Sequence, residues 1–494
     1  DDVRISGLST GLSTERGAIQ PWSTAREAAE DGTFLLFGST CWYFAEKLTD
    51  ELRRERMGDG DPVPVPVGLI HASHGGSMIE QWFDDATEVG CADVCPSKRL
   101  PMLRGQSLYD QSVLPYVNTT VKGFLWYQGE NNMKGGSKTC VLGNSLLGTG
   151  YSCLMVKLVQ QFRNLWSAVP GTTDPLAPFG VVALPRSGTE GNPNMGMFRW
   201  AQTGGYGVLP NEAMPNTFLV QSYDVDDPYR RPYSFCTMNK CCIGKCRDKA
   251  HMKERYGFEC RMCQDLCGNF CKSLEATQFY MGTIHPREKR EIGARLGLAA
   301  ARISVYGAGS GRGGAATGPT LAGCRLDRPG GRSLLDSADS AAPAGNGSRL
   351  GILHIFFNST LLAGDVVHVQ GYNRSRPGLS KLEVLVERID EAADERENLM
   401  PPNEDKWVSV EFLTYGPASG GGYEVLADLT SLPDGAAAYA VRYAWEGTCC
   451  DSTPEPGTLE AQTRVCPLAS CPIYARPSGL PANPFLAEIV GGRC

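Results

Sequence analysis

Short apolar runs alternate with helical patterns from residue 34 to residue 307, and no other feature restricts the fold of this chain as strongly. In 34–57 and 285–307 the apolar side chains recur at helical spacing. The apolar runs that end in small or polar residues are 65–73, 123–127, 179–185 and 216–224. This alternation predicts an α/β fold, in which helices flank a parallel sheet and ligands bind at the carboxyl ends of its strands.

The composition changes after residue 307. Residues 308–348 are rich in Gly, Ala and Ser, which is typical of a flexible linker or a long loop. Beyond them, short runs with strand periodicity continue to residue 447 without a long helical pattern, and a tail rich in Cys and Pro follows. We therefore expect an α/β domain at 1–307 and a small all-β sandwich domain at 349–494.

Cysteines and glycosylation sequons indicate an oxidising compartment. The chain has 19 cysteines, an excess for a cytosolic enzyme, and N-x-S/T sequons at Asn118, Asn346, Asn358 and Asn373. We expect a secreted, lysosomal or cell-surface protein with glycans on these asparagines. Residue 1 begins no signal peptide, so we expect the sequence to be a processed form or to lack its start.

Charge and hydropathy argue against two further classes of protein. The formal net charge is −7 and no basic tract stands out, so we expect no nucleic-acid partner. No apolar run reaches the ~18–20 residues that a helix needs to cross a bilayer, so we expect no transmembrane segment.

A cysteine-rich insertion interrupts the α/β domain at 228–275. Its cysteines lie between Cys236 and Cys271, and Cys260 and Cys263 have the C-x-x-C spacing of zinc ligands. The alternative is a surface insertion held by disulfides, because so short a segment cannot bury a core of its own. With sequons in the chain and only His251 nearby, we favour disulfides and expect no metal.

Polar groups follow two of the apolar runs directly. Gly75 and Gly76 lie between the run 65–73 and a helical pattern, where backbone N–H groups can face an anion, although an ordinary tight turn has the same pattern. Gln128, Asn131 and Asn132 follow the run 123–127. Their amides suit an oxyanion site and a buried structural network equally well.

A histidine offers a general base. His285 lies on a loop directly before a helical pattern, where a substrate could reach it, although a single histidine is more often structural. A general base needs an acid to orient it, and Asp224, Asp226 and Asp227 follow the run 216–224 closely enough to serve.

Taken together, these segments resemble the sialate O-acetylesterase family of the SGNH-hydrolase superfamily. The matching segments stand in family order and extend over nearly the whole chain: STCWYFAEKL, VGLIHASHGGSMIEQW, SLYDQSVLPY, VKGFLWYQGENN, FRWAQTGGYGVLPNEAMPNTF, TIHPREKREIGARL, VRYAW and CPIYARPSGLPANPF. The paired glycines, W-Y-Q-G-E and I-H-P-R-x-K are together specific. The resemblance implies an SGNH-hydrolase-like sheet and the hydrolysis of O-acetyl groups on sialic acids or related sugars, without a metal or other cofactor.

The resemblance also implies roles for individual residues. A serine attacks the acetyl carbonyl, His285 accepts its proton and an acid orients His285, with Asp224 the best positional match and Asp226 or Asp227 as alternatives. The implied oxyanion donors are Gly76 and Gln128, with Asn132 as a second amide. The residues expected to shape the substrate pocket are Gly75, Glu80, Trp82, Glu130 and His74.

The sequence departs from the family pattern at three places. Thr283 stands where many members have Asp, and His74 stands where a Trp usually precedes the glycines, so His74 either contacts substrate or, as we favour, fills the place of the Trp. The family's serine lies in a G-Q-S-N-M block that this chain lacks. Ser107 ends a G-Q-S triplet but aligns with a helix start, so we interpret it as a helix cap. We expect the serine on a missing segment or an N-terminal partner chain.

These departures leave a second interpretation open. A catalytically inactive extracellular protein could keep the same scaffold and bind glycans or serve a structural role, because a fold does not determine a function. A G-Q-S-N-M block upstream of residue 1 would favour the esterase, and its replacement would favour the inactive protein.

Overall fold

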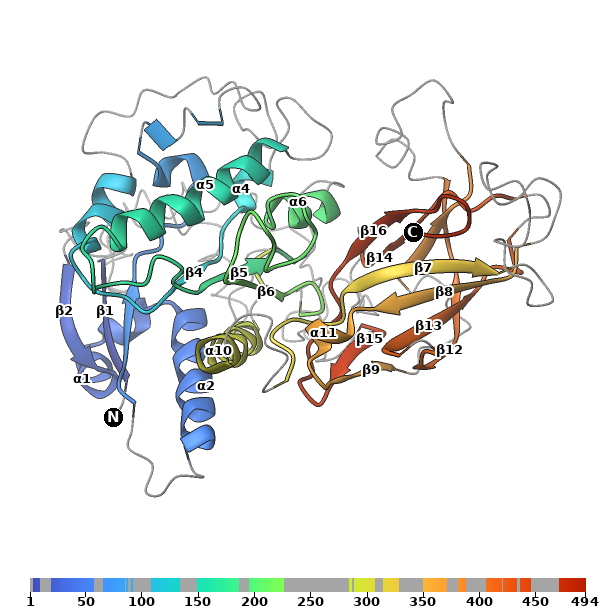
Figure 1. Ribbon diagram of the computed structural model, residues 1–494. Coiled ribbons are helices and arrows are strands. Elements are labelled where there is room, and N and C mark those ends of the chain that lie inside the picture. The colour runs from blue at the N-terminus through green and yellow to red at the C-terminus, as the bar shows by residue number, and fades with distance from the viewer. Residues whose placement is uncertain are drawn as a thin grey trace, which may run out of the picture.

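The computed structural model shows an α/β part and a β-sheet part side by side, with the two ends of the chain in different parts (Figure 1). The α/β part holds the first strands and the long helices, and the β-sheet part holds the strands from residue 321 onward. The structure describes residues 3–8, 19–56, 65–84, 86–87, 90–91, 108–133, 149–185, 195–225, 284–286, 288–306, 314–327, 350–370, 381–387, 406–419, 421–432, 436–445 and 471–494.

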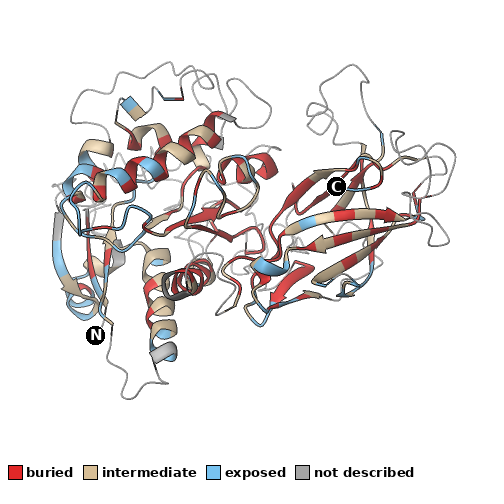
Figure 2. Cartoon of the chain, viewed as in Figure 1, coloured by how far each residue is buried: buried red, intermediate tan, exposed pale blue. Residues whose placement is uncertain are grey.

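Three parallel strands form the centre of the α/β part. The elements around them are β4 (Phe124–Trp126), β5 (Phe179–Ala183), β6 (Thr217–Gln221), α2 (Ser39–Arg56), α4 (Glu130–Met133), α5 (Thr149–Trp166), α6 (Met195–Ala201) and α10 (Lys289–Tyr306). The strand order is β4-β5-β6. Val181 of β5 packs in the core that contains α5, whereas its neighbour Val182 packs in the core that contains α10 and α2. Figure 1 shows α5 on one side of the sheet and α2 with α10 on the other, and Figure 2 shows that the strands are buried between them.

The helices α2 and α10 approach each other closely at two glycines of α10. A Cβ on Gly293 would lie 2.6 Å from the Cβ of Tyr43, and a Cβ on Gly297 would lie 2.6 Å from the carbonyl oxygen of Phe44. Larger side chains would not fit at these positions unless the helices moved apart. This contact sets the position of α10, which begins just after His285.

A second sheet covers the edge of the α/β part. Its elements are β1 (Val3–Leu8), β2 (Ile19–Thr24), β3 (Val67–His71) and the short helix α1 (Ala25–Glu30). The strand β1 pairs antiparallel with β2 and parallel with β3. Thr24 caps α1, because its side chain accepts a hydrogen bond from the Glu27 N–H at 3.1 Å.

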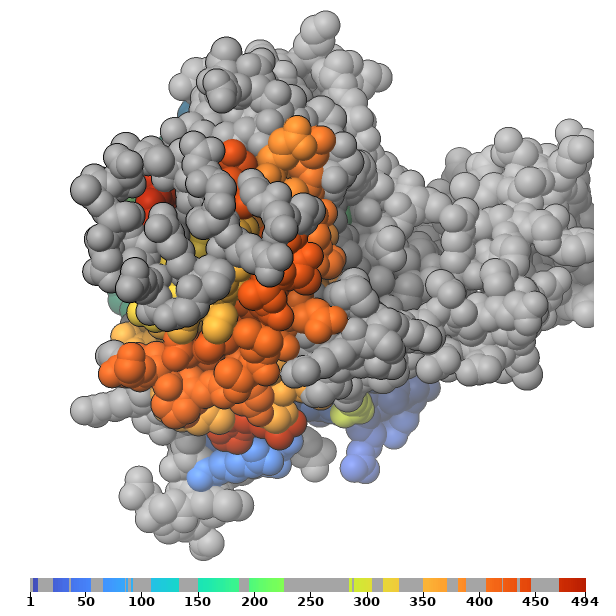
Figure 3. Space-filling model, turned by 90° about the vertical axis from the view of Figure 1, so that its right-hand side faces the viewer, coloured from blue at the N-terminus to red at the C-terminus, as the bar shows by residue number. Residues whose placement is uncertain are grey.

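Antiparallel sheets make up the rest of the chain. The elements are β7 (Leu321–Asp327), β8 (Ile352–Phe357), α11 (Ser359–Leu362), β9 (Val366–Val369), β10 (Leu382–Leu385), β11 (Trp407–Ser409), β12 (Glu411–Pro417), β13 (Tyr423–Asp428), β14 (Ala440–Tyr443), β15 (Ile473–Arg476) and β16 (Phe485–Glu488). The strand orders are β12-β13-β8-β7, β11-β10-β14-β16 and β15-β9. One core joins the sheets, with Ile355 of β8 and Val441 of β14 both in it. In Figure 3 the segment of β12 and β13, in orange, forms much of the face toward the viewer.

The α/β class and the parallel sheet are confirmed, and one strand lies where we expected a linker. The strand β7 falls within 308–348 and pairs antiparallel with β8. Its local sequence contains Gly, Arg and Asp, but Cys324 and Leu326 alternate into the core of the β-sheet part. Pairing with a distant strand therefore outweighs the weak local preference.

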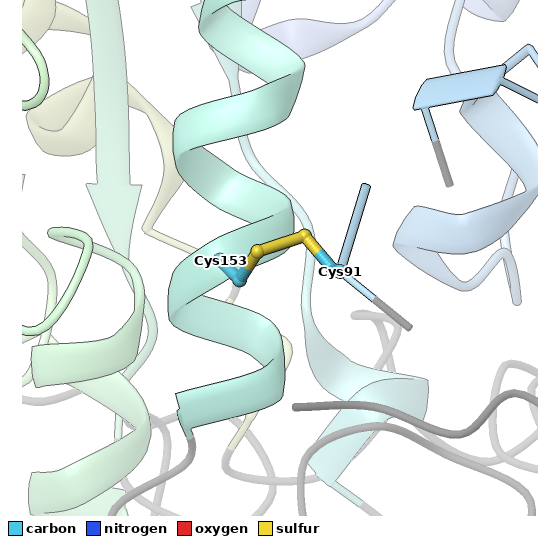
Figure 4. The surroundings of a disulfide bond; sticks show 2 residues. All are labelled: Cys91 and Cys153. Atoms are coloured by element: carbon cyan, nitrogen blue, oxygen red, sulfur yellow. A yellow bond between two sulfur atoms is a disulfide. The ribbon is translucent and has the colours of Figure 1, made fainter. Parts of the chain in front are cut away.

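Disulfides are present in both parts of the molecule. Cys91 is bonded to Cys153 of α5, with an S–S distance of 2.04 Å (Figure 4). A second disulfide joins Cys324 of β7 to Cys494. The cysteines of the insertion at 228–275 lie outside the described residues, so their pairing stays a prediction. None of the helices that the structure describes has the length and apolar character that a membrane-spanning helix needs.

Candidate active site

The turn after β3 exposes two glycines. Gly75 and Gly76 are both exposed, as is His74 before them. Gly76 has φ = +80°, a left-handed conformation that favours glycine. The 3-10 helix Ile79–Trp82 follows, and its two end residues pack in the core beside Trp126 of β4. The turn therefore presents an accessible backbone on a firmly anchored segment.

The polar groups after β4 form a buried hydrogen-bond network. The Nε2 of Gln128 donates to the carbonyl oxygen of Ser77 at 2.9 Å and to the Oδ1 of Asn132 at 2.8 Å. Its Oε1 accepts from the hydroxyl of Tyr151 at 2.9 Å. The Oδ1 of Asn132 also accepts from the backbone N–H of Ile79 at 3.0 Å. Both amide hydrogens of Gln128 are therefore used inside the protein.

Further contacts tie this network to the glycine turn. The Nδ2 of Asn132 donates to the Oε2 of Glu80 at 2.9 Å, and Asn132 is fully buried. The Nδ2 of Asn131 donates to the carbonyl oxygen of Gly76. Glu130 begins α4 directly before these asparagines. The structure thus brings together the candidates that follow β3 and those that follow β4.

The turn that carries His285 packs beside the end of β4. Ile284 is fully buried in the same core as Trp126. The Nζ of Lys289, in the first turn of α10, lies 4.8 Å from the ring centre of Tyr127. His285 itself is half-buried, and its Nδ1 atom is buried. These contacts place the residues on either side of His285 near the end of β4, which Gln128 follows.

Asp224 has strong partners of its own. Its carboxylate is fully buried and accepts hydrogen bonds from the guanidinium of Arg295 at 2.6 and 2.7 Å. It also accepts one from the hydroxyl of Tyr474 at 2.9 Å. Asp226 and Asp227 lie outside the described residues. Which of the three acids orients His285 therefore stays a prediction.

Three residues that complete these networks were missed by the sequence analysis. They are Tyr151, Arg295 and Tyr474. For Arg295 a signal existed, because it is a single charged residue among the buried apolar positions of α10, such as Ile292 and Leu296. A charge on such a face needs a buried partner. No local pattern marks Tyr151 or Tyr474.

The remaining candidates are spread over the molecule. Asn118 is exposed, and the Oδ1 of Asn358 accepts from the Leu361 N–H at 3.1 Å as the cap of α11. Among the described residues, no three His, Cys, Asp or Glu side chains gather in a way that would bind a metal ion. Ser107, Thr283, Asn346 and Asn373 lie outside the described residues.

A second histidine lies close to the glycine turn. His71 ends β3, and its Nε2 lies 2.6 Å from the Oγ of the exposed Ser73. Its ring packs against Phe37, with 5.2 Å between the ring centres. Burial lowers the pKa of His71. The imidazole is therefore neutral in the folded chain at neutral pH.

Comparison with known proteins identifies relatives for part of the chain. The sequence model of a family described as carbohydrate esterase, sialic acid-specific acetylesterase matches residues 43–226. This segment contains the glycine turn, the network around Gln128 and Asp224, and it ends before His285.

Individual relatives give the same result. The chain is 30% identical over 208 residues to sialate O-acetylesterase of Homo sapiens, a match that covers 40% of this chain and 35% of the relative. It is 28% identical over 230 residues to sialate O-acetylesterase of Mus musculus, which covers 40% of this chain and 38% of the relative. The match thus spans little more than a third of the relatives' own length.

Proposed function

Because this chain belongs to the sialate O-acetylesterase family through residues 43–226, we propose that it contributes the base and the oxyanion side of an acetyl-ester hydrolase. Its substrate is an O-acetyl group on a sialic acid or a related sugar. The catalytic scaffold is an SGNH-hydrolase-like sheet, to which β4, β5 and β6 belong.

The proposed reaction has two steps. His285 accepts the proton of a serine hydroxyl as the serine oxygen attacks the acetyl carbonyl, and it returns that proton to the departing sugar oxygen. His285 then accepts a proton from the water that attacks the acetyl-serine, and it returns this proton to the serine oxygen as acetate is released. The family's G-Q-S-N-M block is absent from these 494 residues, so the proposal assigns the serine to another segment or to a partner chain.

The oxyanion side rests on the glycine turn. The backbone N–H of Gly76 and the amides of Gln128 and Asn132 are the proposed donors to the tetrahedral intermediate. The observation that supports this best is the joining of the glycine turn to the end of β4, through the hydrogen bond from Asn131 to Gly76. In the structure the amide of Gln128 donates to Ser77 and Asn132. It would have to break one of these hydrogen bonds to donate to the oxyanion.

A hydrolysis assay tests the proposal. The chain is incubated with an O-acetylated sialic acid, alone and together with a family peptide that carries the G-Q-S-N-M block. We expect acetate release only in the presence of the peptide and its loss in His285→Ala. The control is His368→Ala, which changes a histidine of β9 in the β-sheet part and should leave turnover unchanged. Turnover that survives His285→Ala would refute the role of His285.

One observation favours a second function, binding of glycans without catalysis. Both amide hydrogens of Gln128 are used within the protein, so the proposed oxyanion site is not preformed. Calorimetric titration with an O-acetylated sialic acid distinguishes the two functions. Binding that persists without acetate release, with and without the added peptide, would favour the binding protein.

The cysteines and sequons support a proposal about the cellular location of the protein. Disulfides such as Cys91–Cys153 persist in oxidising compartments, and Asn118 is an exposed sequon. We therefore propose that the protein is secreted, lysosomal or on the cell surface. Mass spectrometry of the protein from a secretory host would show glycans on Asn118 if this is correct.

A further inference from the structure

A buried ion pair lies where β6 ends against α10. The guanidinium of Arg295 donates to both carboxylate oxygens of Asp224, and its Nη1 also donates to the carbonyl oxygen of Gln221 at 2.8 Å. Its Nε donates to Glu291 at 3.0 Å. Asp224 is 0% exposed and Arg295 is 4% exposed. A two-pronged contact of this kind fixes the position of α10 along β6, because the guanidinium fork has one geometry.

The β-sheet part completes this ion pair. Tyr474 of β15 donates to the Oδ2 of Asp224 at 2.9 Å, and its own oxygen accepts from the Cys471 N–H at 3.1 Å. Burial and the charge of Asp224 raise the pKa of Tyr474, so the hydroxyl stays a donor. The bond joins residues that are 250 positions apart in the chain.

Two further hydrogen bonds join the end of β6 to the β-sheet part. The Nε2 of Gln221 donates to the Oδ1 of Asn483 at 2.9 Å, and the hydroxyl of Tyr223 donates to the carbonyl oxygen of Ala482 at 2.5 Å. The donors are buried in both cases. The segment that ends β6 is therefore held by the β-sheet part at three of its residues.

From this geometry we propose that Tyr474 is a positioning residue for His285. In this proposal Asp224 anchors α10 through Arg295 and is not the acid that orients His285. The proposal rests on the proposed function, in which His285 is the base. The β-sheet part thereby becomes a component of the catalytic apparatus, although it contributes no group to the reaction.

The connection to His285 passes through α10. His285 lies four residues before the first residue of this helix, and Arg295 lies in its second turn. Loss of the Tyr474 hydroxyl leaves the buried Asp224 with Arg295 alone, and the pair must readjust to satisfy the carboxylate. Arg295 is also held by Glu291 and by the carbonyl oxygen of Gln221, so we expect the readjustment to move α10 and, with it, the turn before the helix.

The test is the variant Tyr474→Phe, which removes one hydroxyl and keeps the ring. The full chain is labelled with ¹³C-histidine, and the His285 resonance, assigned by its loss in His285→Gln, is followed against pH. We expect its titration midpoint to move by about 0.5 pH unit or more. With the G-Q-S-N-M peptide present, kcat should fall about tenfold while KM stays unchanged.

The matched control is Val425→Ala, which removes buried volume from β13 far from Asp224 in the chain. Val425 is 0% exposed, so this variant destabilises the β-sheet part without touching the ion pair. His285 should titrate as in the unaltered chain. A Tyr474→Phe protein that is destabilised like Val425→Ala but whose His285 midpoint is unmoved would show that Tyr474 is merely structural.

Two further variants keep the outcomes separate. If Tyr474→Phe fails to fold, Tyr223→Phe breaks the neighbouring bond to Ala482 and should move the same His285 midpoint; an unmoved midpoint there also overturns the proposal. If His285→Ala does not affect turnover, the proposed function fails, and the His285 midpoint in Tyr474→Phe still decides whether Tyr474 positions that residue.

Discussion

At the scale of single residues, Gln128 is a polar side chain at the end of a strand that is held in a buried hydrogen-bond network. Its amide donates to the carbonyl oxygen of Ser77 and to the Oδ1 of Asn132, and it accepts from the hydroxyl of Tyr151. All three bonds have ordinary lengths and lie in a buried place, so the amide has a single orientation. An oxyanion at this position would therefore compete with Ser77 or Asn132 for one of the two amide hydrogens.

The variant Gln128→Glu tests whether the network supports the fold. Glutamate keeps the shape but donates no hydrogen bond at neutral pH, so it faces the oxygens of Ser77 and Asn132 as an acceptor. We expect the free energy of unfolding to fall by about 2–3 kcal/mol in urea titrations. The control Lys122→Ala changes an exposed residue and should stay within about 0.5 kcal/mol. Equal stability of the two variants would contradict a structural role for Gln128.

The burial of His71 leads to a prediction of how the free energy of unfolding depends on pH. Burial lowers its pKa below the ordinary value of 6.5, so below that pH the unfolded chain binds a proton that the folded chain resists. The contribution of His71 to stability is therefore fully present above pH 6.5 and declines as the pH falls. Unfolding free energies measured from pH 5 to pH 8 should fall less steeply on the acid side in His71→Gln. An unchanged slope in this variant would show that other groups cause the loss.

Secondary-structure elements differ in how far the sequence alone reveals them. The helix α10 and the strands β5 and β6 follow from local periodicity, since long amphipathic or apolar runs have few alternatives. The strand β7 does not, because its partner β8 decides its conformation. The same holds for the site: glycines and amides at strand ends were recognisable, whereas the partner of Asp224 lies 71 residues away on α10.

The crossing of α2 and α10 gives a prediction at the scale of elements. Gly297→Ala would stabilise an isolated helix, but here the new Cβ would lie 2.6 Å from the carbonyl oxygen of Phe44. We expect a net destabilisation of about 1–3 kcal/mol, measured by chemical unfolding. Gly416→Ala on β12 is the control, because nothing lies within 4 Å of the added methyl group. A stabilised Gly297→Ala protein would mean that the helices separate at little cost.

Buried contacts join the two parts of the molecule beyond the ion pair at Asp224. Arg199 of α6 is 2% exposed, and its Nη1 donates to the carbonyl oxygens of Ala444 at 2.9 Å and Trp445 at 3.2 Å. The ring of Trp445 packs on Gly196, where an added Cβ would lie 2.2 Å from it. A buried interface with directional bonds couples the stability of its two sides, so neither part should unfold alone.

Arg199→Met is expected to uncouple them. Methionine preserves most of the buried stem, but the carbonyl oxygens of Ala444 and Trp445 lose their donor. The unaltered chain should unfold in one transition, with tryptophan fluorescence and far-ultraviolet circular dichroism coinciding. In Arg199→Met the two probes should separate into two transitions, because each part then unfolds according to its own stability. The same substitution at Arg54, whose side chain is 66% exposed, should leave the single transition in place. Coincident probes in Arg199→Met would mean that the bonds that Gln221 and Tyr223 donate to the β-sheet part, and the bond that Asp224 accepts from it, suffice to couple the two parts.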